Sequence, residues 1–174
     1  QRIQIPIKIH AEQLSSFGAT RLAAQYKALS ADHLEYATEE DILSLKASGT
    51  VPVLLPGAFY FLREERMPPI ELFRQHHVPF ALATDFNPGT SPILSVLSIM
   101  NLACVLWRIT PQEALKGITL NAASALGLCK QVGSLAIGKD ADLAFWSIDT
   151  PTELAYHLSG LSCAQLVKKG IGVL

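Results

Sequence analysis

Three side chains that can bind metals or move protons stand at the ends of short apolar segments. His10 and His33 each end a segment rich in apolar residues, and Asp85 follows the apolar run 78–82. Imidazole and carboxylate groups are common metal ligands and general acids or bases. Because α/β enzymes collect their sites at the carboxyl ends of buried strands, we expect these three side chains to meet around one site.

A tight turn directly after Asp85 adds groups that could hold a polar or anionic ligand. Its residues are Asn87-Pro88-Gly89-Thr90. The glycine lets backbone approach a ligand closely, and the amides and hydroxyls can donate hydrogen bonds. Purely structural roles stay open at this point: Asp85 could cap the next helix, and each histidine could be a core residue bonded to backbone.

The composition argues against nucleic-acid and membrane partners. The chain has 174 residues, 49% of them hydrophobic, and a net charge of -1, with lysine and arginine scattered. A nucleic-acid surface needs a basic stripe, and a membrane helix needs about 18 uncharged apolar residues in a row; the sequence shows neither. The three cysteines lie far apart in apolar contexts. They are typical of reduced core residues, so we expect a cytoplasmic protein.

Apolar periodicity and turn residues predict four strand–helix units followed by a small β region. Strands are expected over 3–9, 30–34, 51–56 and 79–84. Helices are expected over 13–29, 39–48, 67–77, 93–106 (buried all round), from 111 onward and over 119–128, with 58–66 as an aromatic-rich connection. Short strands are expected over 132–135, 138–146 and around 167–170.

This order of elements indicates an α/β fold. Four consecutive βα units with right-handed crossovers fit either a doubly wound sheet or half of a (β/α)8 barrel. A Gly-x-Gly-x-x-Gly motif does not follow the first predicted strand, which weakens a dinucleotide-binding interpretation. Histidine and aspartate at successive strand ends favour the barrel.

Four segments in chain order resemble the imidazolonepropionases, a family of the amidohydrolase superfamily. They are KIHAEQL (8–14), SADHLE (30–35), LLPGAF (54–59) and ATDFNPGT (83–90). Segments 119–123 and 132–143 resemble the closing part of that superfamily, which many cyclic amidohydrolases and deaminases share. The resemblance implies the C-terminal half of a metal-dependent-hydrolase TIM barrel in residues 1–128. It also implies the C-terminal part of a small composite β-sandwich domain in residues 129–174.

The resemblance also implies an activity and roles for particular residues. The reaction would be hydrolysis of 4-imidazolone-5-propanoate to N-formimidoyl-L-glutamate in histidine degradation, with zinc or iron bound. His10 and Asp85 would be metal ligands, Asp85 would also relay a proton, and His33 would polarise the ring carbonyl. The residues expected to contact substrate are Gln13, Asn87, Gly89 and Thr90.

The sequence departs from the family pattern in ways that set expectations about partners. It contains no His-x-His motif, which supplies two further metal ligands in the family, and some relatives carry Glu where this chain has Gln13. We therefore expect a C-terminal half that needs a missing N-terminal half of the same protein, with weak or no metal binding and no turnover alone. Besides a small-molecule substrate, we expect a homo-oligomer.

Two alternatives stay open. The first is another cyclic amidohydrolase or aminohydrolase of the same superfamily, against which the turn over 87–90 argues. The second is a non-catalytic half-barrel that self-associates to cover the open edges of its sheet.

Overall fold

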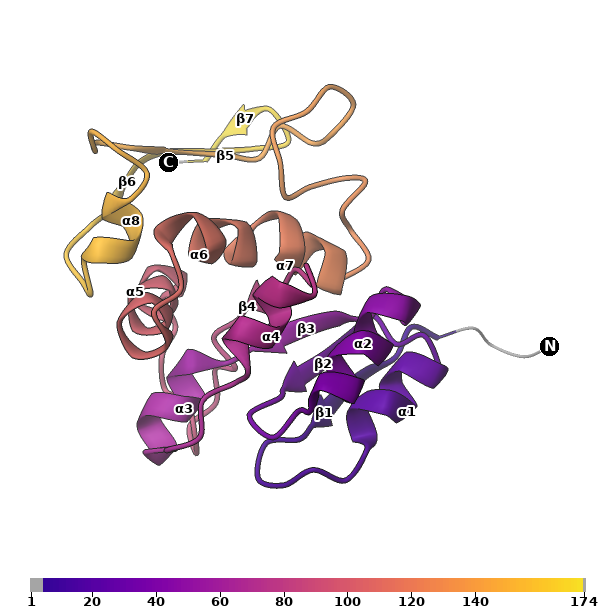
Figure 1. Cartoon of the computed structure of the whole chain (residues 1–174). Coiled ribbons are helices and arrows are strands. Elements are labelled where there is room, and N and C mark those ends of the chain that lie inside the picture. Colours follow the sequence, from indigo (N-terminus) through magenta and orange to yellow (C-terminus); the bar gives the residue numbers. More distant parts are fainter. Residues whose placement is uncertain (1–4, 174) are drawn as a thin grey trace.

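A four-stranded parallel sheet lies at the centre of the structure, a computed structural model that describes residues 5–173 (Figure 1). The strands, in spatial order, are β1 (Lys8–Ala11), β2 (Ser30–His33), β3 (Val51–Leu54) and β4 (Ala81–Leu82). Each strand pairs in parallel with the next one along the chain. A doubly wound sheet changes direction on either side of its first strand, whereas this order runs one way, as in a barrel.

Helices connect the strands and cover the sheet. They are α1 (Ala19–Gln25), α2 (Glu39–Ser48), α3 (Pro56–Leu62), α4 (Ile70–Gln75), α5 (Val96–Trp107), α6 (Pro111–Ile118) and α7 (Leu120–Ala125). Helix α1 packs against α2 and β1, and α6 and α7 pack against β4. None of the helices in residues 5–173 combines the length and the apolar character that crossing a membrane requires.

Capping boxes set the starts of two helices. The Thr38 hydroxyl accepts from the Asp41 amide, and the Asp41 carboxylate accepts from the Thr38 amide at 2.8 Å. Thr110 and Glu113 make the same reciprocal pair at the start of α6. Each box satisfies two backbone donors that a helix start would otherwise leave unpaired. Gly49 ends α2 in the left-handed conformation, with φ at 76°.

Three of the elements that differ from the sequence-based expectation lie in residues 1–66. Strand β1 lies later than the predicted strand 3–9, because its pairing with β2 begins at Lys8; residues 1–4 lie outside the described structure. Residues 58–66 are not a plain connection, since α3 begins directly after β3 with Pro56 in its first turn. The helix expected over 13–29 begins only at Ala19, and a loop held by Glu12 precedes it.

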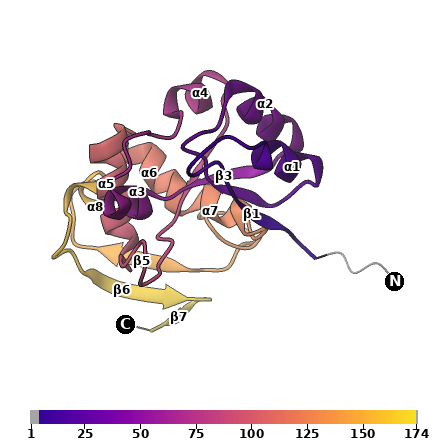
Figure 2. The ribbon, with the colours of Figure 1, turned by 90° about the horizontal axis from the view of Figure 1, so that it is seen from below.

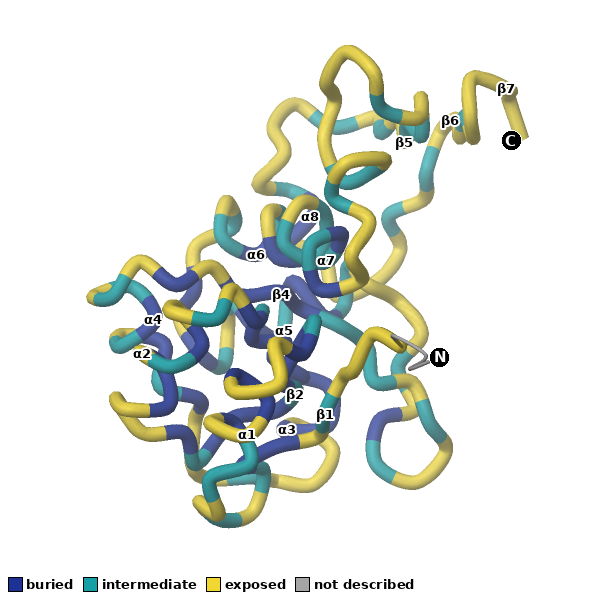
Figure 3. Tube along the Cα trace, turned by 90° about the vertical axis from the view of Figure 1, so that its right-hand side faces the viewer, coloured by how far each residue is buried: buried dark blue, intermediate teal, exposed yellow. Residues whose placement is uncertain are grey.

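The core lies between the parallel sheet and its helices. Figure 3 shows buried segments concentrated there. The largest fully buried apolar side chains are Leu34, Ile42, Leu45, Leu54, Phe73, Ile99 and Met100. Helix α5 was expected to be buried all round, but Val105 is 67% exposed, so only one face of α5 packs into this core.

A second, antiparallel sheet forms the C-terminal part of the chain, to one side of the first (Figure 2). It contains β5 (Leu143–Trp146), β6 (Cys163–Lys168) and β7 (Ile171–Gly172). Residues 169–170, which fall within the strand expected around 167–170, form the turn between β6 and β7. The strand predicted over 132–135 is wrong: this segment is a turn in which Gly133 has φ at 90° and leaves no room for a Cβ beside Ala123.

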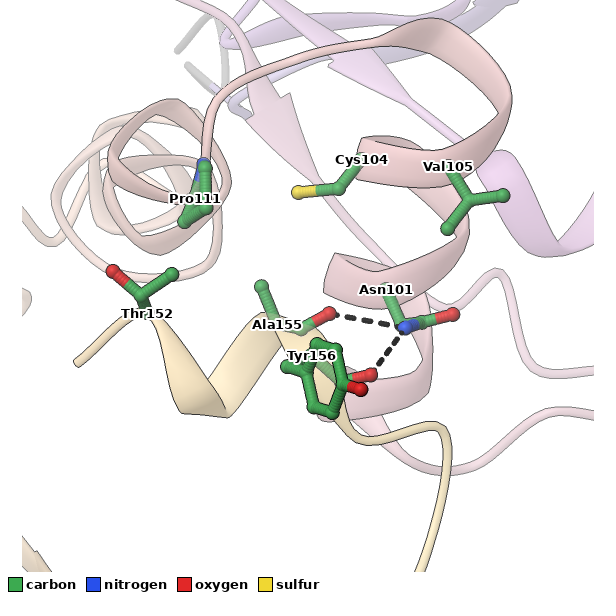
Figure 4. A pocket seen from close by; sticks show the side chains of 7 residues that line it. All are labelled: Asn101, Cys104, Val105, Pro111, Thr152, Ala155 and Tyr156. Atoms are coloured by element: carbon green, nitrogen blue, oxygen red, sulfur yellow. Dashed lines mark hydrogen bonds between the residues drawn. The ribbon is translucent and has the colours of Figure 1, made fainter. Parts of the chain in front are cut away.

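A short helix that the sequence did not predict, α8 (Glu153–Tyr156), ties the C-terminal segment to the first core. The Asn101 side chain on α5 donates hydrogen bonds to the carbonyls of Ala155 and Tyr156, at 3.0 and 2.8 Å (Figure 4). The groove beside this contact is lined mainly by apolar atoms. Its residues are Asn101, Cys104, Val105, Pro111, Thr152, Ala155 and Tyr156, none of which the sequence indicated as a site residue.

Candidate active site

The structure brings His10, His33 and Asp85 together at the carboxyl end of the parallel sheet. The ring centroids of the two histidines are 4.2 Å apart, and His33 Nε2 lies 4.0 Å from Asp85 Oδ2. That second distance is too long for a hydrogen bond. The juxtaposition agrees with the sequence-based expectation, because parallel neighbouring strands present their ends at one edge.

The backbone at these strand ends adopts conformations that residues other than glycine seldom take. The φ angles are 47° at Glu12, 82° at His33, 75° at Leu34 and 48° at Asp85. Such left-handed residues persist where the surrounding structure determines them, and they concentrate at functional sites. Neither periodicity nor residue type indicated them in advance.

Burial keeps the His33 imidazole neutral at neutral pH. The residue is 4% exposed, and burial, aided by the charge of nearby His10, lowers the His33 pKa to about 4. Within residues 5–173, its Nδ1 atom has no hydrogen-bond partner. A neutral imidazole carries one N–H, which can donate a hydrogen bond to a carbonyl oxygen.

Asp85 combines partial burial with two charged neighbours. Burial raises the pKa of its carboxyl group, the positive charge of His10 opposes this, and the negative charge of Asp32 adds to it. The side chain keeps 35% of its surface exposed, so a water molecule or a ligand can reach it. Asp32 itself accepts a hydrogen bond from Ser30 Oγ at 2.6 Å.

The turn after Asp85 is organised by the Asn87 side chain. Its Nδ2 donates to the Asp85 carbonyl at 2.8 Å and to Thr90 Oγ1 at 2.9 Å. Its Oδ1 accepts from the Gly89 and Thr90 amides at 2.9 and 2.7 Å. The amides that the sequence offered to a ligand are therefore engaged inside the turn. A ligand would meet the outer surface of this turn.

The far end of the same loop is anchored by two residues that sequence reasoning missed. Ser91 is fully buried and donates to the Thr84 carbonyl at 2.6 Å. Gly57, in the first turn of α3, makes room for it, since a Cβ there would lie 2.6 Å from Ser91 Oγ. In the sequence, this contact is indicated by Gly57, the small residue directly after Pro56.

Gln13 follows β1 in a loop that runs to Gly18. Gln13 is half-buried, and its side chain makes none of the hydrogen bonds found in residues 5–173. Its neighbour Glu12 points away from His10 into the loop, where its carboxylate accepts backbone hydrogen bonds.

The donors at the sheet edge fit part of a metal site. One imidazole and one carboxylate, from His10 and Asp85, are the ligand types that zinc takes in hydrolytic enzymes, but such sites use three or more protein ligands. Across the described part of the chain, no group of three or more His, Cys, Asp or Glu side chains is placed to hold a metal ion. These two residues could therefore supply a share of the coordination and not all of it.

Comparison with known sequences places the chain among hydrolases. The model of the amidohydrolase family matches residues 1–171. A curated imidazolonepropionase from Pseudomonas savastanoi pv. phaseolicola is 56% identical over 98% of the chain, and one from Colwellia psychrerythraea is 55% identical over all of it. The chain spans 42% of the length of each of these relatives.

Solved structures with the same fold include two deaminases. A zinc-bound adenosine deaminase from Xanthomonas campestris superposes with a TM-score of 0.80 at 21% identity, over 98% of this chain and 45% of that one. A 5-methylcytosine deaminase from Klebsiella pneumoniae gives 0.79 at 17% identity, over 97% of this chain and 48% of that one. The α/β fold with a parallel sheet that the sequence predicted is thereby confirmed as that of the amidohydrolases.

Proposed function

We propose that this chain, which belongs to the amidohydrolase family, supplies the C-terminal part of the active site of an imidazolonepropionase. The reaction would be hydrolysis of the cyclic amide C–N bond of 4-imidazolone-5-propanoate, giving N-formimidoyl-L-glutamate. The observation that carries this choice of substrate is the high identity to curated imidazolonepropionases across nearly the whole chain. The cluster at the sheet edge supports a hydrolytic reaction.

Asp85 and His33 divide the chemical work in this proposal. The Asp85 carboxylate takes a proton from the attacking water and delivers it to the leaving ring nitrogen, as general base and then general acid. With 35% of its side-chain surface exposed, the Asp85 carboxylate is accessible to that water molecule. The neutral His33 donates a hydrogen bond to the ring carbonyl oxygen, where negative charge develops in the transition state.

We propose that His10 and Asp85 are also ligands of one divalent or trivalent metal, zinc or iron. When bound, such a metal lowers the pKa of a water molecule from about 15.7 towards about 7. The remaining ligands would come from an N-terminal half of the same protein, outside this chain. A solved structure with this fold, the Xanthomonas campestris deaminase, holds bound zinc, which agrees with a metal-binding protein.

The substrate would lie between the loops that follow β1 and β4. We assign contacts with it to Gln13 on one side and to the turn on the other, through Asn87, Gly89 and Thr90. The Gly89 and Thr90 amides already donate to Asn87, so they would not bind the substrate. The substrate would contact the outer surface of the turn.

The remaining proposals concern organisation and location. Residues 1–128, with the parallel sheet, would be half of a TIM barrel, and residues 129–174, with the antiparallel sheet, part of a β-sandwich domain. Strands β1 and β4 are the outer strands of the parallel sheet, where an N-terminal half could pair. We also propose a homo-oligomer in the cytoplasm, where the three unpaired cysteines would stay reduced.

A substrate comparison tests the proposed function. The complete protein that contains this chain would be incubated with 4-imidazolone-5-propanoate, and N-formimidoyl-L-glutamate would be followed by mass spectrometry. We expect this product, together with one tightly bound metal per protein. Adenosine and 5-methylcytosine serve as competing substrates. Turnover of either instead would assign the chain to an aminohydrolase, and an inert, metal-free dimer would favour the non-catalytic half-barrel.

A further inference from the structure

We propose that Glu12 is a positioning residue of this site: it fixes the loop after β1 and thereby places Gln13. This inference rests on the proposed function for its effect on catalysis. It is carried by the geometry of a single carboxylate. Glu12 is only 4% exposed, although it lies beside a loop whose residues are largely in contact with solvent.

All four hydrogen bonds to the Glu12 carboxylate come from the end of the loop and the start of α1. Oε1 accepts from the Phe17 and Ala19 amides, at 3.2 and 2.8 Å. Oε2 accepts from the Thr20 amide at 2.8 Å and from the Thr20 hydroxyl. Both oxygens are thus occupied by the protein itself. Glu12 therefore acts through the loop and not on the substrate.

The loop has little else to hold its shape. Leu14 is 69% exposed and Phe17 is 89% exposed, so apolar burial contributes almost nothing between Glu12 and Gly18. The loop is held instead by hydrogen bonds to the Glu12 carboxylate. Hydrogen bonds to an anionic acceptor are stronger than those between neutral groups. Gln13 follows the anchored residue directly, so its position depends on the closed loop.

The backbone of Glu12 also joins this loop to its neighbour. The Glu12 carbonyl accepts from the Tyr36 amide at 2.8 Å, and the Ala11 carbonyl accepts from the Leu34 amide at 3.1 Å. These bonds continue the β1–β2 pairing past the strand ends, to the segment that begins with His33. The residue that closes the Gln13 loop is therefore fixed relative to the two histidines.

The test begins with Glu12→Gln in the complete protein. The amide keeps the size of the side chain but has only one oxygen, so two of the four bonds are lost. Glu40→Gln is the matched control, because the Glu40 side chain is 74% exposed and, within residues 5–173, pairs with Arg21 alone. At a temperature where all variants are folded, we expect Glu12→Gln to raise KM about tenfold or more with a smaller change in kcat. Metal content should not change, since His10 precedes the loop and is held in β1.

A second pair of variants changes Thr20, which donates hydrogen bonds to Glu12 from its amide and its hydroxyl. Thr20→Val removes the hydroxyl that donates to Glu12, and Thr20→Ser keeps it. We expect Thr20→Val to raise KM in the same direction as Glu12→Gln, and Thr20→Ser to restore wild-type values. The effects of Glu12→Gln and Thr20→Val should be less than additive in the double variant, because both substitutions disturb the same interaction.

Hydrogen exchange separates failure of this inference from failure of the proposed function. If Glu12 fixes the loop, amides in residues 12–20 exchange faster in Glu12→Gln than in the wild type or Glu40→Gln, whether or not the protein hydrolyses the proposed substrate. Unchanged exchange over 12–20 would overturn the inference. So would a lower melting temperature accompanied by wild-type KM and kcat, because that result describes a residue with a structural role only.

Discussion

The loop after β1 and the loop after β4 both follow a strand end that carries a proposed metal ligand, yet different side chains hold them in place. The first depends on the buried Glu12 carboxylate, which only accepts hydrogen bonds and takes them from residues up to eight positions away. The second depends on the Asn87 amide, which donates and accepts within four residues.

This difference predicts how far a structural change in each loop should extend to its surroundings. The donors to the Glu12 carboxylate lie at the end of its loop and in α1, and the Glu12 backbone carbonyl accepts from the Tyr36 amide, so the first loop is tied to α1 and to the segment after β2. An amide can close a turn by itself, so the second loop is largely self-contained, apart from the buried anchor at Ser91. Changes in the first loop should spread, and changes in the second should stay local.

The largest expected effect comes from removing the chemistry of the second loop while keeping its shape. Asn87 binds the Asp85 backbone carbonyl and not its carboxylate, so Asp85→Asn leaves the turn intact. We expect kcat of the complete protein to fall by about three orders of magnitude or more, with nearly unchanged thermal unfolding. Asp149→Asn at an exposed position is the control. Turnover at the wild-type rate would remove Asp85 from the mechanism.

Measuring the free energy of unfolding against pH extends the comparison to Glu35, a buried carboxylate that lacks hydrogen-bond donors among the described residues. Glu35, after β2, is 1% exposed, and neither carboxylate oxygen has a hydrogen-bond partner in residues 5–173. Burial raises its pKa from 4.5 to about 7, and the charge of Glu64 adds to the rise. The folded state then holds a proton that the unfolded state has lost, so this contribution to stability is complete below pH 4.5 and is lost as the pH rises through 7.

Glu35→Gln should remove that pH dependence. Relative to the wild type, the variant should gain up to about 3 kcal/mol in free energy of unfolding between pH 4.5 and pH 8. Urea unfolding of both proteins at the two pH values measures the difference. An equal difference at both values would show that Glu35 has the same protonation state when folded and unfolded.

Crowding the anchor of the second loop should have a smaller effect. Gly57→Ala places a methyl group against Ser91 Oγ and against Ile99 Cδ1, which would lie 3.1 Å away. Overpacking of this kind should lower the free energy of unfolding by about 2 kcal/mol. Gly172→Ala is the matched control, since nothing lies within 4 Å of a Cβ built there. Equal stability of the two variants would mean that the anchor tolerates displacement.

The smallest effect is expected inside the turn itself. Asn87→Asp keeps the acceptor for the Gly89 and Thr90 amides and removes the two donated bonds, one of them to the Asp85 carbonyl. We expect a loss of about 1 kcal/mol, with hydrogen exchange altered only near residues 85–91. Faster exchange in the loop after β1 as well would contradict the separation of the two loops.

Local signals in the sequence were sufficient for some of these features. Thr38 and Thr110 each precede an acidic residue by three positions, a spacing that is typical of capped helix starts. The meeting of His10, His33 and Asp85 could also be predicted, because apolar segments of strand length end at each of them. Parallel pairing then brings those ends to one edge.

Other features depend on contacts that a single segment does not reveal. The apolar spacing over 13–29 indicated one helix, but the carboxylate of Glu12 binds amides as far on as Thr20 and excludes a helix from its first part. The sequence predicted a strand over 51–56 and a connection over 58–66, yet residues 56–62 form α3, in which Phe59 packs edge-on against Trp107. The residue types of the turn after Asp85 could not say whether its amides face a ligand or Asn87.

The α5–α8 contact has a consequence for how the chain would respond to a protease. The segment between α7 and β5 is largely exposed, with Leu135 at 80% and Ile137 fully accessible, so it is a preferred place for cleavage. Beyond it, the Asn101 side chain holds α8, and Leu154 and Trp146 pack into the first core. A cut in this segment should therefore nick the chain without separating its two pieces, which would elute together until denatured.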